Sequence, residues 1–137
     1  MIEVIPSLPA LSFAELKTKM ALVEGAVSTF QIDICDGMFV TNRTWPMNPG
    51  DKAQFERIVR GEEAMPFWEE MDFEADLMMH EPEKILSDLI KAGFMRALIH
   101  IEARHDFSAC LAEAKDRLEL GIALSIGTDI ARIGEYI

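Results

Sequence analysis

The chain has 137 residues, of which 50% are hydrophobic and 27% are charged, and its formal net charge is −11. This length suffices for one domain with a hydrophobic core. The negative charge argues against a nucleic-acid partner, because a phosphate backbone would be repelled. No apolar run approaches the ~20 residues that cross a bilayer, and the N-terminus lacks the basic and apolar parts of a secretory signal. Cys35 and Cys110 form no CxxC motif, so we expect a cytoplasmic protein with reduced thiols.

Five short apolar runs, typical of β-strands, alternate with helical stretches along the whole chain. The runs cover Ile2–Ile5, Thr29–Ile34, Phe73–Met78, Ala97–Ile101 and Ile122–Ser125. Helix starts are predicted at Ser12, Asp51, Pro82, Asp106 or Ser108, and Thr128 or Asp129. Strand-helix units of this length predict parallel strands joined by right-handed helical crossovers. The fold class is therefore α/β in a single domain, and the pattern alone leaves an open sheet and a closed barrel as alternatives.

Polar side chains gather at the C-terminal ends of the predicted strands after the first. Residues two apart in a strand face the same way. The resulting sets are Gln31, Asp33 and Cys35; Glu74, Asp76 and Met78; His100 and Glu102; and Ser125. Parallel α/β folds build their sites at this edge of the sheet. A functional cluster is therefore expected, although any single member would more simply be a capping or core residue. Its predicted members are Asp33, Asp76, His100 and Glu102.

Three carboxylates in one cavity repel one another unless a cation, a basic group or bound protons compensate their charge. Oxygen-rich ligands with one imidazole and one amide favour Mg²⁺ or Mn²⁺, with Zn²⁺ and Fe²⁺ as alternatives. Cys35 is better explained as a small buried residue than as a nucleophile, because no His follows it at a telling distance.

Five segments resemble motifs of the ribulose-phosphate 3-epimerase family, in the family's order. "IPSLPALSFAEL" is similar to its opening strand and helix, and "QIDICDGMFVTN" is similar to H-x-D-V-M-D-G-x-F-V-P-N. "FEADLMMHEPE", "LIHIEA" and "LGIALSIGT" resemble D-x-H-L-M-V-x-x-P, F-H-x-E-A and G-x-A-L-N-P-x-T. The second-strand segment is the most specific of the five, and together they span nearly the whole chain.

This resemblance implies a TIM-type (β/α)8 barrel that inverts a carbon beside the ketone of a pentulose phosphate, using a divalent metal and two Asp residues. By position, Asp33 matches the Asp that is both acid/base and metal ligand, and Ser7 and Met78 match substrate-contacting residues. His100 and Glu102 are expected near the same substrate. Asp76 and Gln31 fall where the family has metal-binding His residues, so the resemblance predicts either a changed metal or lost metal binding.

Only about five of the eight β/α units are present, and the family's second catalytic Asp and phosphate loops belong to later units. A partial barrel would leave strand edges exposed. We therefore expect a fragment of a longer barrel, inactive alone in two-base inversion, or a homo-oligomer that pairs those edges. The loop-rich insertion at about 43–71, with Trp45, Phe67 and Trp68, is a candidate lid or dimer contact, or simply covers the domain's own helices.

Three functional hypotheses follow from these motifs. The leading one is an epimerase-like isomerase that acts on a pentulose or related sugar phosphate. The alternative is a non-catalytic barrel relative that binds a sugar phosphate or a protein partner, which the replacements Gln31 and Asp76 favour. An aldolase or decarboxylase of the same superfamily ranks last, because the Lys residues fall in predicted helices rather than on inner strand positions.

Overall fold

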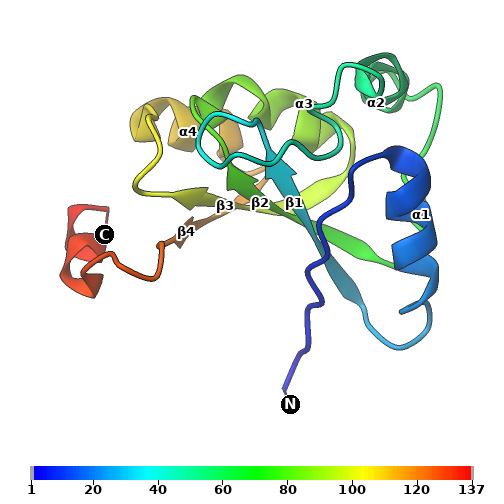
Figure 1. Ribbon diagram of the computed structural model, residues 1–137, viewed down its shortest axis with the longest axis horizontal. Coiled ribbons are helices and arrows are strands. Elements are labelled where there is room, and N and C mark those ends of the chain that lie inside the picture. Colours follow the sequence, from blue (N-terminus) through cyan, green and yellow to red (C-terminus); the bar gives the residue numbers. More distant parts are fainter. Residues whose placement is uncertain (1, 137) are drawn as a thin grey trace.

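Four parallel strands form one sheet in the order β1-β2-β3-β4 in the computed structural model, which describes residues 2–136 (Figure 1). The strands are β1 (Thr29–Cys35), β2 (Asp72–Met78), β3 (Phe94–His100) and β4 (Glu119–Ala123). The helices are α1 (Phe13–Ala21), α2 (Lys52–Val59), α3 (Leu86–Lys91) and α4 (Phe107–Ala114), with the 3-10 helices η1 (Pro82–Lys84) and η2 (Ile130–Glu135). The predicted α/β class and the strand-helix alternation are confirmed.

The prediction that the first apolar run, Ile2–Ile5, forms a regular strand is wrong. Within residues 2–136, the N-terminal segment joins β1 through one isolated parallel bridge between Ser7 and Gln31, beside a 2.9 Å hydrogen bond from the Gln31 amide to the Pro6 carbonyl. Pro6 has no N–H to donate to a ladder, and the side chains of Ile2 and Val4 are exposed rather than packed. The segment therefore lies along β1 without forming a ladder.

Three predicted helix starts are confirmed by capping side chains, whereas Asp51 precedes α2 without a capping hydrogen bond and Pro82 opens the 3-10 helix η1 instead of α3. The Ser12 hydroxyl accepts a 3.2 Å hydrogen bond from the Glu15 amide, and the Glu15 carboxylate accepts one from the Leu11 amide at 2.8 Å. Asp106, rather than Ser108, caps α4. The last predicted helix is the 3-10 helix η2, and Asp129 caps it.

One face of the sheet carries the hydrophobic core, under α3 and α4 (Figure 1). Alternate residues of the strands, among them Phe30, Ile32, Leu77 and Ile99, are buried there. Trp45 of the insertion is also fully buried, with its ring centroid 5.8 Å from that of Phe13. For this Trp, covering the domain's own helices is the correct explanation.

A β-bulge in β3 decides which residues reach the other face, called here the inner face. Phe73 pairs with Phe94, but the next residue of β2, Glu74, pairs with Arg96 rather than Met95. Because side chains alternate along a strand, skipping Met95 turns Arg96 and His100 to the same side as Glu74 and Asp76. Without this extra residue, His100 would face the helices.

None of the helices in residues 2–136 is both long and apolar enough to span a membrane.

Candidate functional site

Asp33 and Asp76 lie side by side near the C-terminal ends of β1 and β2, where the strand register pairs them directly. The Ser7 hydroxyl donates a 2.5 Å hydrogen bond to Asp33 Oδ1. Burial raises the pKa of Asp33; the bond from Ser7 partly opposes this, and the charge of Asp76 reinforces it. Asp33 is thus a partly buried carboxyl with a raised proton affinity, as a general base near neutral pH requires.

The His100 ring lies between two carboxylates. Its Nε2 is 3.2 Å from Asp76 Oδ1, and its Nδ1 is 3.7 Å from Glu102 Oε2. The Asp76 carboxylate raises the pKa of His100 against the opposing effect of burial, with Glu102 adding to the increase. None of these four atoms has a partner in hydrogen-bond geometry within residues 2–136, although all are buried. Buried polar atoms left unpaired are rare and mark a place where a ligand's polar groups would be favoured.

The other oxygen of Glu102 holds the loop that follows β4. Glu102 Oε1 accepts a 2.8 Å hydrogen bond from the Ser125 amide and a further one from the Thr128 hydroxyl. Burial alone would raise the pKa of this carboxyl, but the two donors and the nearby His100 lower it to about 2. Glu102 is therefore an ionised anchor, and not an acid/base group at neutral pH.

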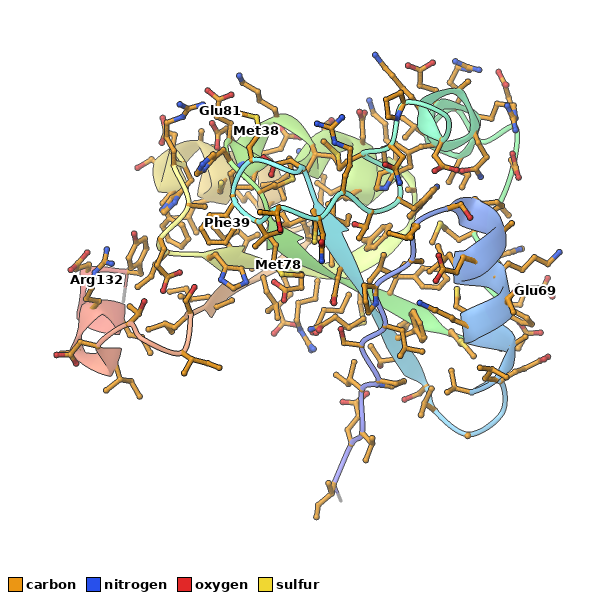
Figure 2. All side chains as sticks on the ribbon, in the orientation of Figure 1. Met38, Phe39, Glu69, Met78, Glu81 and Arg132 are labelled. Carbon is orange, nitrogen blue, oxygen red and sulfur yellow. The ribbon has the colours of Figure 1, made fainter. Side chains whose placement is uncertain are left out.

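The Asp36-Gly37 break after β1 carries the chain back over these groups. The buried Asp36 carboxylate accepts hydrogen bonds from the amides of Met38 and Phe39. It accepts another from the His80 amide in the loop that follows β2. Although burial raises the pKa of Asp36, these amides lower it. The Phe39 ring lies 5.3 Å from the His100 ring and 5.7 Å from the His80 ring between centroids; Figure 2 labels Phe39 and Met78. The loop therefore forms an apolar cover at the rim of the site.

Gly37 permits this turn because its φ is +76°. A Cβ there would also lie 3.3 Å from Arg43 Nε, which donates a hydrogen bond to the Asp36 carbonyl. The Asp-Gly pair thus ends the strand and aims the following residues at the site.

A second polar row crosses the inner face one level below the first. The register aligns Gln31, Glu74, Arg96 and Glu119, one residue from each strand. Gln31 Nε2 donates to Glu74 Oε1 at 2.6 Å, and Arg96 binds Glu74 at 2.7 Å and Glu119 at 3.0 Å. This row is a continuous ion-pair and hydrogen-bond chain at the base of the site.

The predicted metal ligands do not form a metal site in this arrangement. Gln31 is held by Glu74, and Asp33 Oδ1 is occupied by Ser7. The two nitrogens of His100 point in opposite directions, so Asp76 and Glu102 cannot join this ring around one ion. Among residues 2–136, no three His, Cys, Asp or Glu side chains are grouped to hold a metal. The donor set therefore does not fit a divalent cation, and we derive no chemical step through one.

The structure brings most of the predicted site residues to one face. Ser7, Asp33, Asp76, His100 and Glu102 are linked by the contacts described above. Cys35 is buried and its thiol pKa is raised by burial, which agrees with a packing role.

Sequence reasoning missed Arg96 and Phe39. Arg96 shares the parity of His100 but precedes the predicted strand, which began at Ala97, and Phe39 has no chemical signature of its own. A clue to Arg96 was available in the buried Glu74, which needs a cationic partner.

Comparison with known proteins gives consistent matches. A model of the ribulose-phosphate 3 epimerase family matches residues 3–137. Ribulose-phosphate 3-epimerases of Treponema pallidum (strain Nichols) and Chlamydia pneumoniae are 26% and 27% identical over 96% of this chain, which covers 56% and 53% of theirs. The Candida glabrata ribulose-phosphate 3-epimerase is 28% identical over 93% of this chain and is covered over 54% of its length. The chain spans about half the length of the curated relatives it matches.

Proposed function

The chain belongs to the ribulose-phosphate 3-epimerase family, and from this we propose that its inner face is the proton-abstracting half of a sugar-phosphate isomerase site. The sheet is then one part of a (β/α)8 barrel, with the inner face lining the barrel's interior. The substrate is a pentulose phosphate or a related ketose phosphate. The observation that carries the proposal is the partly buried Asp33, whose pKa is raised and which Ser7 orients.

Asp33 acts as the base in this proposal. Its carboxylate takes the proton from the carbon beside the ketone, the electron pair of that C–H bond forms the C=C bond of the enediolate, and the π pair of the C=O bond moves onto the oxygen. Ser7 occupies one carboxylate oxygen and leaves the other free for the substrate. The same Asp33 returns a proton to the same face of the planar intermediate.

His100 stabilises the negative charge that develops on the substrate's oxygen, and Asp76 favours the protonated ring by raising the pKa of His100. The buried nitrogens of the His100 ring lie beside Asp76 and have no partner in hydrogen-bond geometry among residues 2–136, so the ring can donate a hydrogen bond to the developing oxyanion. Met78 and Phe39 cover the carbon skeleton and exclude water at the rim. Inversion needs a second acid on the opposite face, and Asp76 lies on the same face as Asp33. The chain by itself is therefore expected to exchange the proton without inverting the carbon.

Deuterium exchange tests this proposal directly. Ribulose 5-phosphate is incubated with the protein in D2O, and loss of the proton beside the ketone is followed by NMR. We expect exchange above the buffer rate, and a decrease of about 10²–10⁴-fold in Asp33→Asn, the range for one acid/base group. Glu119→Gln, on an exposed carboxylate of the lower row, is the matched control and should exchange as the wild type does. An exchange rate equal to that of buffer, or unchanged in Asp33→Asn, contradicts the proposal.

A non-catalytic member of the family that binds sugar phosphates is the second candidate. Gln31 favours it, because its amide is committed to Glu74 and does not face a substrate. This alternative predicts saturable binding of ribulose 5-phosphate without exchange, and binding that persists in Asp33→Asn. Calorimetry on the two proteins separates the candidates.

A further inference from the structure

A cavity of about 420 Å³ lies at the end of the sheet opposite the candidate site. Its wall includes Asp72 and Phe73, which begin β2, and Gly93, which precedes β3, whereas Asp33 and His100 lie near the other ends of their strands. Its apolar lining comes from Ile58, Ala64, Met65, Trp68, Met71 and Phe73. This volume falls within the roughly 300–1,000 Å³ of ligand-binding sites. The proposed isomerase chemistry makes no use of it.

The segment 61–72 that forms this wall is fixed in place. Met65 and Met71 are buried in the core, and the amides of Glu70 and Met71 donate to the Phe67 carbonyl at 3.0 and 2.9 Å. Phe67 adopts a left-handed φ of +57°, which turns the next side chain outward. As a result Trp68 is 60% exposed at the cavity, while Trp45 is buried. A large aromatic held in the open by an ordered turn has the character of a binding hot spot.

The charge around the cavity is mainly negative, although Lys91 also lines the wall and lies 3.9 Å from Asp88. Residues 61–72 include five acidic residues and no basic ones. Arg57 and Arg60 of α2 pair with Glu63 and Glu62 and neutralise those two. Asp72 on the cavity wall has no ion pair within the part of the chain that the structure describes, and Glu69 projects away from the domain at the edge shown in Figure 2. The surroundings are therefore negative around an apolar floor.

We propose that this cavity is a docking site for a basic peptide segment of a partner protein. One large apolar side chain of the segment packs against Trp68 and the two methionines, whose flexible thioethers adapt to its shape. Lys or Arg residues beside that side chain meet Asp72 and the acidic segment, which speeds encounter and fixes orientation. An acidic segment would lack the charge contribution, and a segment without a large apolar side chain would lack the packing contribution.

Anisotropy of a labelled peptide tests the proposal without any substrate. The probe is a short synthetic peptide of Leu and Lys; a Gly/Lys peptide of equal charge and a Leu/Glu peptide are the comparison probes. We expect the Leu/Lys peptide to bind to the 137-residue protein, and Trp68→Ala to weaken binding about 10-fold or more, as for an interface hot spot. Leu111→Ala on α4, where Leu111 is 52% exposed, is the matched control and should leave affinity unchanged.

Asp72→Asn provides a second variant that keeps the shape of the side chain. It should weaken binding about three-fold at low salt and have no effect near 1 M salt, where the screening length is about 3 Å. Circular dichroism verifies that each variant is folded. Equal binding of the Gly/Lys peptide, or an affinity unchanged in Trp68→Ala, would show only general attraction to a negative protein and overturn the proposal. If the unchanged protein self-associates and Trp68→Ala does not, the occupant of the cavity is a second copy of this chain, and the proposal is overturned too. Because no assay here uses ribulose 5-phosphate, failure of this proposal leaves the isomerase proposal untouched.

Discussion

Two rows of polar side chains cross the same inner face, and they differ in how well their atoms are paired. In the lower row, Gln31, Glu74 and Arg96 are joined by bonds of 2.6 and 2.7 Å. In the upper row, the facing atoms of Asp76 and His100 are buried 3.2 Å apart, but no atom among residues 2–136 meets them in hydrogen-bond geometry. Both rows have similar chemistry and share the strands β1, β2 and β3. The rows therefore differ in how well their polar atoms are paired by hydrogen bonds, and not in the kinds of residue that they contain.

This difference separates structure from chemistry. A saturated network stabilises the sheet and has no free donor or acceptor for a ligand. A row with unpaired buried atoms costs stability and persists where function requires it. The lower row therefore braces the sheet, and the upper row is the part that a substrate completes. Each prediction below tests one side of this division.

The largest effect is expected in the lower row. Glu74→Ala should reduce the free energy of unfolding by about 3 kcal/mol, because it removes a carboxylate that is 6% exposed and leaves Gln31 and Arg96 without their shared partner. Urea denaturation followed by circular dichroism measures this change.

Glu119→Gln is the matched control, because Glu119 binds the same Arg96 but its side chain is 61% exposed. An exposed ion pair contributes little, so its loss should cost less than about 0.5 kcal/mol. Equal effects of the two substitutions would mean that burial does not distinguish the pairs and that the lower row is not a brace.

Much of this division could be read from the sequence, and part of it could not. Alternation within each strand grouped Asp33 with Gln31 and Asp76 with Glu74, because the period of two is a local property. The bulge at Met95 is not local: it depends on Phe73 and Phe94 packing together while Glu74 takes Arg96. The amide of Gln31 likewise looked like a candidate metal ligand until its contact with Glu74 was seen. Pairing across strands decides such roles, and a single sequence does not contain it.

A smaller effect is expected at Glu102. This residue combines the properties of the two rows, because one of its carboxylate oxygens accepts hydrogen bonds and the other does not. Its pKa is about 2, below its ordinary value of 4.5, so its contribution to stability is present above pH 4.5 and is lost as the pH falls toward 2. Glu102→Gln should cost about 2 kcal/mol at pH 7, after allowance for solvent screening. Denaturation at a series of pH values should show the gap between the two proteins closing below pH 4.5. Glu113→Gln, in the exposed pair with Arg117, should show a gap below about 0.5 kcal/mol throughout.

The smallest effect, and the sharpest test of the upper row, concerns the charge on His100. Its pKa is raised mainly by Asp76, so the stability that it contributes is complete below its ordinary value of 6.5 and is lost as the pH rises through the raised pKa. Asp76→Asn removes the first cause and should move the pKa of His100 down toward its ordinary value, with Glu102 still holding part of the increase. NMR titration of the imidazole protons measures this, and His80 and His105, which bond to the Arg104 amide and the Ala103 carbonyl, serve as references within the same spectra. An unchanged His100 titration would mean that the 3.2 Å contact with Asp76 does not control the pKa of this imidazole. The upper row would then not be a site that adjusts the proton affinity of His100.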